Sequence, residues 1–265
     1  MPDGHHYEIW DVFTDTPLEG NPLGVFPHGE EIPSRLYQKL ARELNLSETV
    51  FILGDQIRIF TPVAELPFAG HPTLGAAFVV AERDGRDVVT LQTGAGPVVV
   101  TVAEGYGEMD QPYPSIEPFR GDDAELLAAL GVKRALAPIE SYTNGPTHTV
   151  VVLDDVASLR PDMGRLEALG VQLSAVASTG AGTAKLRMFA PALGVAEDPA
   201  TGSAAGPVAL HLVRHGLHRA GTRLELTQGV EIGRPSTLIA TATEGGPVKV
   251  GGGAVRVATG HYRVA

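Results

Sequence analysis

The chain has 265 residues, 43% of them hydrophobic, which at roughly 150 residues per domain predicts one large or two modest domains. The balance of 20 Lys and Arg against 31 Asp and Glu gives a formal net charge of −11, which disfavours nucleic acid and anionic lipid as partners. The chain has no Cys, and no apolar run approaches the roughly 18 residues of a membrane helix, so we expect a cytoplasmic protein without disulfides or thiolate chemistry.

Short strands outnumber helices in the pattern of apolar residues. Alternating or β-branched runs predict strands at residues 7–13, 50–53, 57–60, 88–92, 97–103, 149–153, 186–189, 224–226, 237–243 and 255–258. Helical periodicity is limited to residues 34–44, 122–130 and 204–215, while residues 1–6 form a polar extension that we expect to be disordered. Many strands with few helices predict an α+β fold.

Three prolines interrupt the pattern near the middle of the chain. Pro112, Pro114 and Pro118 cannot continue a strand or helix interior, so we place the domain boundary there. We therefore expect an N-terminal domain at residues 1–116, which a C-terminal strand at 255–265 is a candidate to complete. The C-terminal domain would span residues 117–254.

A strand–loop–helix unit occurs twice. Residues 58–62 (RIFTP) lead to 70–77 (GHPTLGAA), and residues 187–191 (RMFAP) lead to 202–207 (GSAAGP). A helix rich in Gly and Ala has little side-chain bulk, so a sheet can wrap closely around it. The repeat predicts two similar domains, each a barrel-like sheet around a central helix, with an active site in the cleft between them.

The start of each repeated helix is a candidate anion site. Unpaired N–H groups and a partial positive charge at Gly70-His71 and at Gly202-Ser203 suit a substrate carboxylate, and glycine permits close approach. Isolated dipeptides of this kind are usually ordinary turn and cap residues, which remains the alternative. Their duplication in matched contexts favours a binding role.

Two carboxylates lie near these helix starts. Glu48 falls between a predicted helix and an apolar run, where desolvation raises a carboxyl pKa and makes a general base; a capping or solvated turn residue is the alternative. Asp198, five residues before Ser203, is placed either to pair with a substrate amine or to cap the next helix.

Other motifs argue against cofactors. Residues 93–96 (TGAG) and 179–182 (TGAG) are incomplete as dinucleotide loops. His211, His215 and His218 share a helical face, but no acidic or Cys partner lies alongside them, so we expect an exposed last-turn set and no metal.

Taken together, seven motifs resemble the phenazine-biosynthesis PhzF family over nearly the whole chain. They are residues 11–14 (DVFT), 20–22 (GNP), 45–48 (NLSE), 60–62 (FTP), 65–72 (ELPFAGHP), 198–204 (DPATGSA) and 228–236 (QGVEIGRPS). The resemblance implies the fold of diaminopimelate epimerase, which agrees with the internal repeat. It also implies a homodimer.

The resemblance further implies cofactor-free isomerisation of trans-2,3-dihydro-3-hydroxyanthranilate, in which a proton moves from C3 to C1. By position, Glu48 would be the acid/base, with His71 and Asp198 holding the hydroxyl and amino groups. The substrate carboxylate would be held by Ser203, Ser47 and the backbone at Gly70 and Gly202. Thr201, in the loop that precedes Gly202, would also bind the substrate.

Two rival functions remain. An epimerase or racemase of this fold conventionally uses two Cys residues, and this chain has none. A protein that binds a small carboxylate without catalysis would keep the helix-end sites but would not need an acid/base at Glu48. The same isomerase chemistry on another cyclic amino or hydroxy acid is a further alternative.

Overall fold

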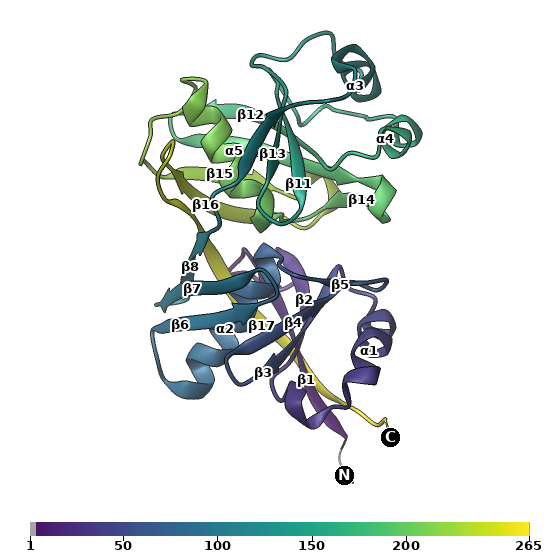
Figure 1. Cartoon of the computed structure of the whole chain (residues 1–265), viewed down its shortest axis with the longest axis vertical. Coiled ribbons are helices and arrows are strands. Elements are labelled where there is room, and N and C mark those ends of the chain that lie inside the picture. Colours follow the sequence, from purple (N-terminus) through teal and green to yellow (C-terminus); the bar gives the residue numbers. More distant parts are fainter. Residues whose placement is uncertain (1–3, 265) are drawn as a thin grey trace. The chain divides into compact units, whose positions relative to one another are not determined.

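A computed structural model describes residues 4–264 of the chain. The chain divides into two compact units: unit 1 comprises Met1–Asp110 with Gly251–Ala265, and unit 2 comprises Gln111–Val250 (Figure 1). Both units mix strands and helices, as the sequence predicts for an α+β fold.

Unit 1 is a ring of strands around one helix. Its strands are β1 (His5–Val12), β2 (Asn21–Phe26), β3 (Glu48–Leu53), β4 (Gln56–Phe60), β5 (Glu65–Leu66), β6 (Val88–Thr93), β7 (Gly96–Ala103), β8 (Tyr106–Gln111) and most of β17 (Val248–Tyr262). Pairing runs β1–β2–β3–β4–β6–β7–β8–β17 and returns to β1, so in the described part of the chain eight strands close a ring.

Helix α2 (Gly70–Asp84) is the central helix of this ring. Every residue of α2 from Gly70 to Val80 is buried. At Gly75 a Cβ atom would lie 2.4 Å from Cδ2 of Leu23 on β2, so the strand packs against the helix backbone itself. The small side chains that identified this helix in the sequence are what lets the ring close around it.

Unit 2 repeats this plan with more helices. Its strands are β9 (Ser115–Pro118), β10 (Glu140–Thr143), β11 (Thr147–Val152), β12 (Leu173–Gly180), β13 (Thr183–Ala190), β14 (Val195–Asp198), β15 (Leu224–Gln228) and β16 (Ser236–Ala242). They pair in the order β9–β10–β11–β12–β13–β15–β16, with β14 on β13. The central helix is α5 (Gly202–Arg214), buried from Gly202 to Leu212.

The other helices cover single faces. In unit 2, α3 (Asp123–Leu130) and α4 (Met163–Leu169) lie together on the side away from α5 (Figure 1). They share one core with β11, β12 and β13. In unit 1, α1 (Tyr37–Leu44) follows a short 3-10 turn at Ser34–Leu36, so the predicted helix at residues 34–44 has two parts.

Some elements differ from the sequence prediction. The strand β2 was not predicted, because its start overlaps residues 20–22 (GNP), which are typical of a turn. The strand β1 begins at His5, so the prediction of a disordered extension was wrong for residues 5 and 6; residues 1–3 lie outside the described residues. The edge strand β9 ends at Pro118 and pairs with β10, so the prolines did not exclude a strand there.

Candidate active site

The first helix start, at α2, offers open backbone donors. Ala69, just before the helix, is extended (φ −149°, ψ 141°), and in the described residues no side chain caps the helix there. The Thr73 hydroxyl donates to the Ala69 carbonyl oxygen at 2.8 Å, which fixes the first turn. The start of α2 therefore keeps the partial positive charge that the sequence predicts at Gly70-His71.

Glu48 and His71 meet beside this helix start. Helix α1 ends at Asn45 in the left-handed conformation (φ 52°), and the chain turns there before β3 begins at Glu48. Oε2 of Glu48 lies 3.5 Å from Nε2 of His71, with the two side chains 18% and 5% exposed. Burial lowers the pKa of His71 to about 3, so its imidazole is neutral at pH 7 and the contact is not an ion pair.

Ser47 is engaged inside unit 1. Its hydroxyl donates to Oδ1 of Asn21 at 2.9 Å, and Asn21 is fully buried at the start of β2. This bond links the motif at residues 20–22 to the motif at 45–48. A serine whose proton is held by Asn21 must rotate before it donates to a ligand, so its structural role here is to fix the turn that precedes Glu48.

The second helix start, at α5, carries Ser203. Its Oγ atom lies 3.0 Å from Nε2 of His148 on β11, and its carbonyl oxygen accepts from Asn144 Nδ2 at 3.0 Å. The Gly202 carbonyl oxygen accepts from Gln111 Nε2 at 2.8 Å. In the described residues no side chain caps α5, so its first N–H groups also remain open.

The proton on His148 is determined by its surroundings. His148 is fully buried, burial lowers its pKa to about 4, and its Nδ1 atom has no hydrogen-bond partner among the described residues. A buried N–H donor without a partner costs more free energy than a buried nitrogen lone pair without one. The proton therefore lies on Nε2, which has a partner, and not on Nδ1. His148 then donates to Ser203, and the Ser203 hydroxyl proton is available to a ligand.

Asp198 and Thr201 are bound together in the loop before α5. The Thr201 hydroxyl donates to Oδ2 of Asp198. Gln228, fully buried at the end of β15, donates to the Asp198 carbonyl oxygen at 2.8 Å and to Thr201 Oγ1 at 2.9 Å, and it accepts from the Thr201 N–H at 3.1 Å. Asp198 therefore does not cap α5, and Gln228 fixes the loop that carries it.

Each set of predicted residues is assembled within its own unit. Glu48 and His71 meet in unit 1, with Ser47 and Gly70 nearby in the chain; Asp198, Thr201, Gly202 and Ser203 belong to one loop and helix start in unit 2. The sequence reasoning missed His148 and assigned no role to Gln228. Gln228 could have been found, because it is the first residue of the motif at 228–236, whereas no motif surrounds His148.

The histidines on α5 are not an exposed set, and the statement that they lack an acidic neighbour was wrong. His211 is fully buried, and Glu140 of β10 lies within 3.3 Å of both His211 and His215. His218 lies apart from them, where its Nε2 atom is 3.1 Å from the Thr222 hydroxyl.

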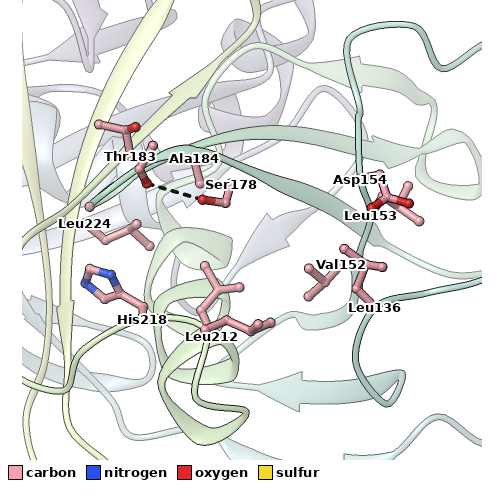
Figure 2. Close-up of a pocket in the computed structure, with 13 residues that line it drawn as sticks. Leu136, Val152, Leu153, Asp154, Ser178, Thr183, Ala184, Leu212, His218 and Leu224 are labelled. Carbon is pink, nitrogen blue, oxygen red and sulfur yellow. Dashed lines mark hydrogen bonds between the residues drawn. The ribbon is translucent and has the colours of Figure 1, made fainter.

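A separate cavity of about 360 Å³ opens at the other end of α5 (Figure 2). Leu212 and His218 line it from the end of the helix, and Leu224 and Thr183 line it from β15 and β13. Since α5 has 13 residues, its two ends are about 18 Å apart, and this cavity is distinct from the helix start at Ser203.

No helix in the described part of the chain is long and apolar enough to span a membrane.

The fold and the two helix starts define a class of protein. It is an α+β protein in which sheets wrap around two helices of small residues, and the open N-termini of these helices lie beside buried polar side chains. The sequence profile described as "Phenazine biosynthesis-like protein" (PhzC-PhzF) matches residues 10–260, and the chain belongs to that family.

Individual relatives agree with this family. The chain is 46% identical over 253 residues to trans-2,3-dihydro-3-hydroxyanthranilate isomerase of Pseudomonas chlororaphis, with 90% of each chain covered. A PhzF-family protein of Enterococcus faecalis, known from a crystal structure, shares 30% sequence identity with the chain. The TM-score is 0.82, and the match covers 98% of this chain and 100% of that protein. A hydroxyproline epimerase of Agrobacterium vitis shares the fold alone, with 12% identity, a TM-score of 0.66, and 96% and 91% of the two chains covered.

Proposed function

We propose that the chain is an isomerase that acts on trans-2,3-dihydro-3-hydroxyanthranilate in phenazine biosynthesis, without a cofactor. Relatives that carry this name are 44–46% identical to it over at least 90% of the chain. The structural observation that carries the proposal is the contact of Glu48 with a neutral, buried His71 at an open helix start.

Glu48 is the acid/base in this proposal. Its carboxylate takes the proton from C3 of the substrate ring and, as a carboxylic acid, returns it to C1. The substrate and product have the same atoms and the same oxidation level, so the reaction needs no oxidant or reductant. One carboxyl group serves both transfers if the ring is fixed with C3 and C1 both within its reach.

His71 suits the role of a hydrogen-bonding group for the substrate hydroxyl. Because burial keeps its imidazole neutral, it offers one N–H donor and one lone pair and adds no positive charge that would hold Glu48 ionised. Asp198, fixed by Thr201 and Gln228, has an acceptor oxygen for the substrate amino group.

The substrate carboxylate is assigned to the helix starts. Backbone N–H groups at Gly70 and Gly202 and the Ser203 hydroxyl are donors of the kind that bind carboxylates. In the proposal the protein works as a cytoplasmic homodimer, which follows the family resemblance. Light scattering on the purified chain tests the dimer.

The reaction is tested by proton NMR on the purified protein with this substrate in deuterated water. The proposal expects the C3 proton signal to disappear, at an unchanged rate in the presence of a chelator. A C1 proton signal appears where the proton is retained and is missing where deuterium from the solvent replaces it. A protein that binds the substrate without converting it would instead support the rival binding function, and conversion of another cyclic acid alone would support the rival substrate.

A further inference from the structure

Three potential metal ligands converge in unit 2, between β10 and the end of α5. Oε2 of Glu140 lies 3.3 Å from Nδ1 of His211 and 3.1 Å from Nε2 of His215. All three ligand atoms lie within 4.8 Å of one another. His211 and His215 are four residues apart, so they lie on one face of the helix.

The two separations from Glu140 Oε2 match the spacing of atoms around one small cation. A tetrahedral site with bonds of about 2.0–2.1 Å has ligand atoms about 3.3 Å apart. Tyr142 brings a fourth potential ligand atom, an oxygen, to the same place, since its hydroxyl is 2.7 Å from Glu140 Oε2 and 3.0 Å from His211 Nδ1. The donor set of two imidazoles and one carboxylate suits Zn²⁺ and similar transition cations more than Mg²⁺ or Ca²⁺.

The surroundings also suit a cation. Arg214 contacts the other oxygen of Glu140, Oε1, at 3.3 Å, which leaves Oε2 turned toward the two imidazoles. Ligating carboxylates are typically hydrogen-bonded in this way from outside the site. Glu140 and His215 are 14% and 20% exposed, which provides an entry side, whereas His211 is fully buried.

The proton of His211 has one favourable position in the cluster. With its proton on Nε2, His211 would have a buried donor without a partner in the described residues, and its Nδ1 lone pair would face the lone pairs of Glu140 Oε2. With the proton on Nδ1, that proton points toward Tyr142 and Glu140 and only the Nε2 lone pair is bare, as the Nδ1 lone pair is in His148. A cation bound by Nδ1 and Oε2 takes the place of this proton.

We propose that Glu140, His211 and His215 form a binding site for a divalent transition cation of the Zn²⁺ type. His211 is eight residues along α5 from Ser203, about 12 Å at the helical rise, so the bound cation does not touch the proposed substrate. It ties the end of the central helix to β10 and stabilises unit 2. This site is independent of the proposed isomerase function.

The test is metal binding by the chelator-stripped, full-length chain, measured by calorimetry with Zn²⁺ and by visible absorption with Co²⁺. The proposal expects one tight equivalent per chain, a tetrahedral Co²⁺ spectrum, and a rise in the melting temperature of roughly 5–10 °C when free Zn²⁺ is 100 times its Kd. His215→Gln and Glu140→Gln should each weaken binding at least tenfold and remove the thermal shift.

Two matched variants serve as controls. His218→Gln changes the neighbouring histidine, and His6→Gln disrupts the His6–His261 ring pair in unit 1; both should leave binding unchanged. Circular dichroism establishes that the Glu140 and His215 variants are folded. The absence of tight binding, binding that survives His215→Gln and Glu140→Gln, or binding that is lost with either control variant would each overturn the proposal. Turnover by the stripped chain at 25 °C reports on the proposed reaction separately.

Discussion

Nε2 of His148 lies 3.0 Å from Oγ of Ser203, and both side chains are buried at the start of α5. The histidine approaches from β11, 55 residues earlier in the chain. Because its Nδ1 atom has no partner in the described residues, the proton belongs on Nε2, and Ser203 accepts that hydrogen bond. The serine hydroxyl is thereby oriented as a donor toward an anion.

Replacing His148 by Phe should therefore weaken substrate binding more than it slows the chemical step. A hydrogen bond to a charged group contributes about 1.5–3 kcal/mol, so we expect KM to rise roughly 10- to 100-fold with a smaller change in kcat. Steady-state kinetics provide the measurement. His148→Gln keeps an N–H donor near the Nε2 position and should recover most of the loss. Equal kinetics for the Phe and Gln variants would argue against the assigned orientation.

Glu48→Gln should abolish proton transfer while leaving the substrate bound. General acid/base catalysis contributes typically 10²- to 10⁴-fold, so we expect kcat to fall by about 10³-fold or more with a Kd close to that of the unchanged chain. Proton NMR follows turnover and calorimetry follows binding. Glu43→Gln, an exposed change at the end of α1, is the matched control. It should turn over and bind the substrate as the unchanged chain does. Wild-type turnover by Glu48→Gln would remove Glu48 from the mechanism.

The buried histidines make stability depend on pH in a defined direction. Burial lowers the pKa values of His71 to about 3 and of His148 and His211 to about 4. Above the unfolded value of 6.5 these groups are neutral in both states. As the pH falls from 6.5 toward 4, the unfolded chain takes up protons that the folded chain does not, so the free energy of unfolding decreases.

Between pH 6.5 and 4, each such buried histidine lowers the free energy of unfolding by up to about 1.4 kcal/mol for each unit that the pH falls. Urea denaturation at pH 7.0, 6.0 and 5.0 measures how the free energy of unfolding changes with pH. His148→Gln should make this slope shallower by the contribution of about one proton taken up on unfolding. His28→Gln, which changes a half-exposed side chain, should leave the slope as it is. A slope that is identical in the His148 variant and the parent chain would contradict burial of a neutral imidazole.

Gln228→Leu should both destabilise unit 2 and impair catalysis. The change removes the partners of the Thr201 N–H and the Asp198 carbonyl in a fully buried place, at a cost of about 2–4 kcal/mol. Urea denaturation checks the stability, and kcat/KM checks the effect on the Asp198 loop. Gln92→Leu, an exposed substitution on β6, provides the comparison. A fully stable and active Gln228→Leu protein would show that the loop is fixed by other contacts.

The parts of the fold that follow from local composition were predictable. The Gly- and Ala-rich stretches after residues 62 and 191 predicted both central helices, because only helices without bulk permit the close packing seen at Gly75. Glu48 was correctly placed at the end of a turn before a buried strand. The short helix α4 was not predicted, since only Leu166 of its seven residues is fully buried and so short a segment gives little periodicity.

Contacts between distant segments were beyond the reach of sequence patterns. His148 meets Ser203 because β11 packs against α5, and Glu140 meets His211 across 71 residues because β10 lies beside β11. Neither pair has a fixed spacing that a motif can encode. The same limit explains why the α5 histidines were interpreted as an exposed set, although their partner comes from a strand that was not predicted.

The pairing of β17 with β1 and β8 also bears on how the chain is made. Unit 2 lies wholly between Gln111 and Val250, so all of its residues have been synthesised before most of β17 exists. Until β17 is added, β1 and β8 are open edges that can pair with other chains. The N-terminal unit is therefore the second to be completed on the ribosome, and a nascent or prematurely terminated chain that ends near residue 250 is the form most prone to aggregate.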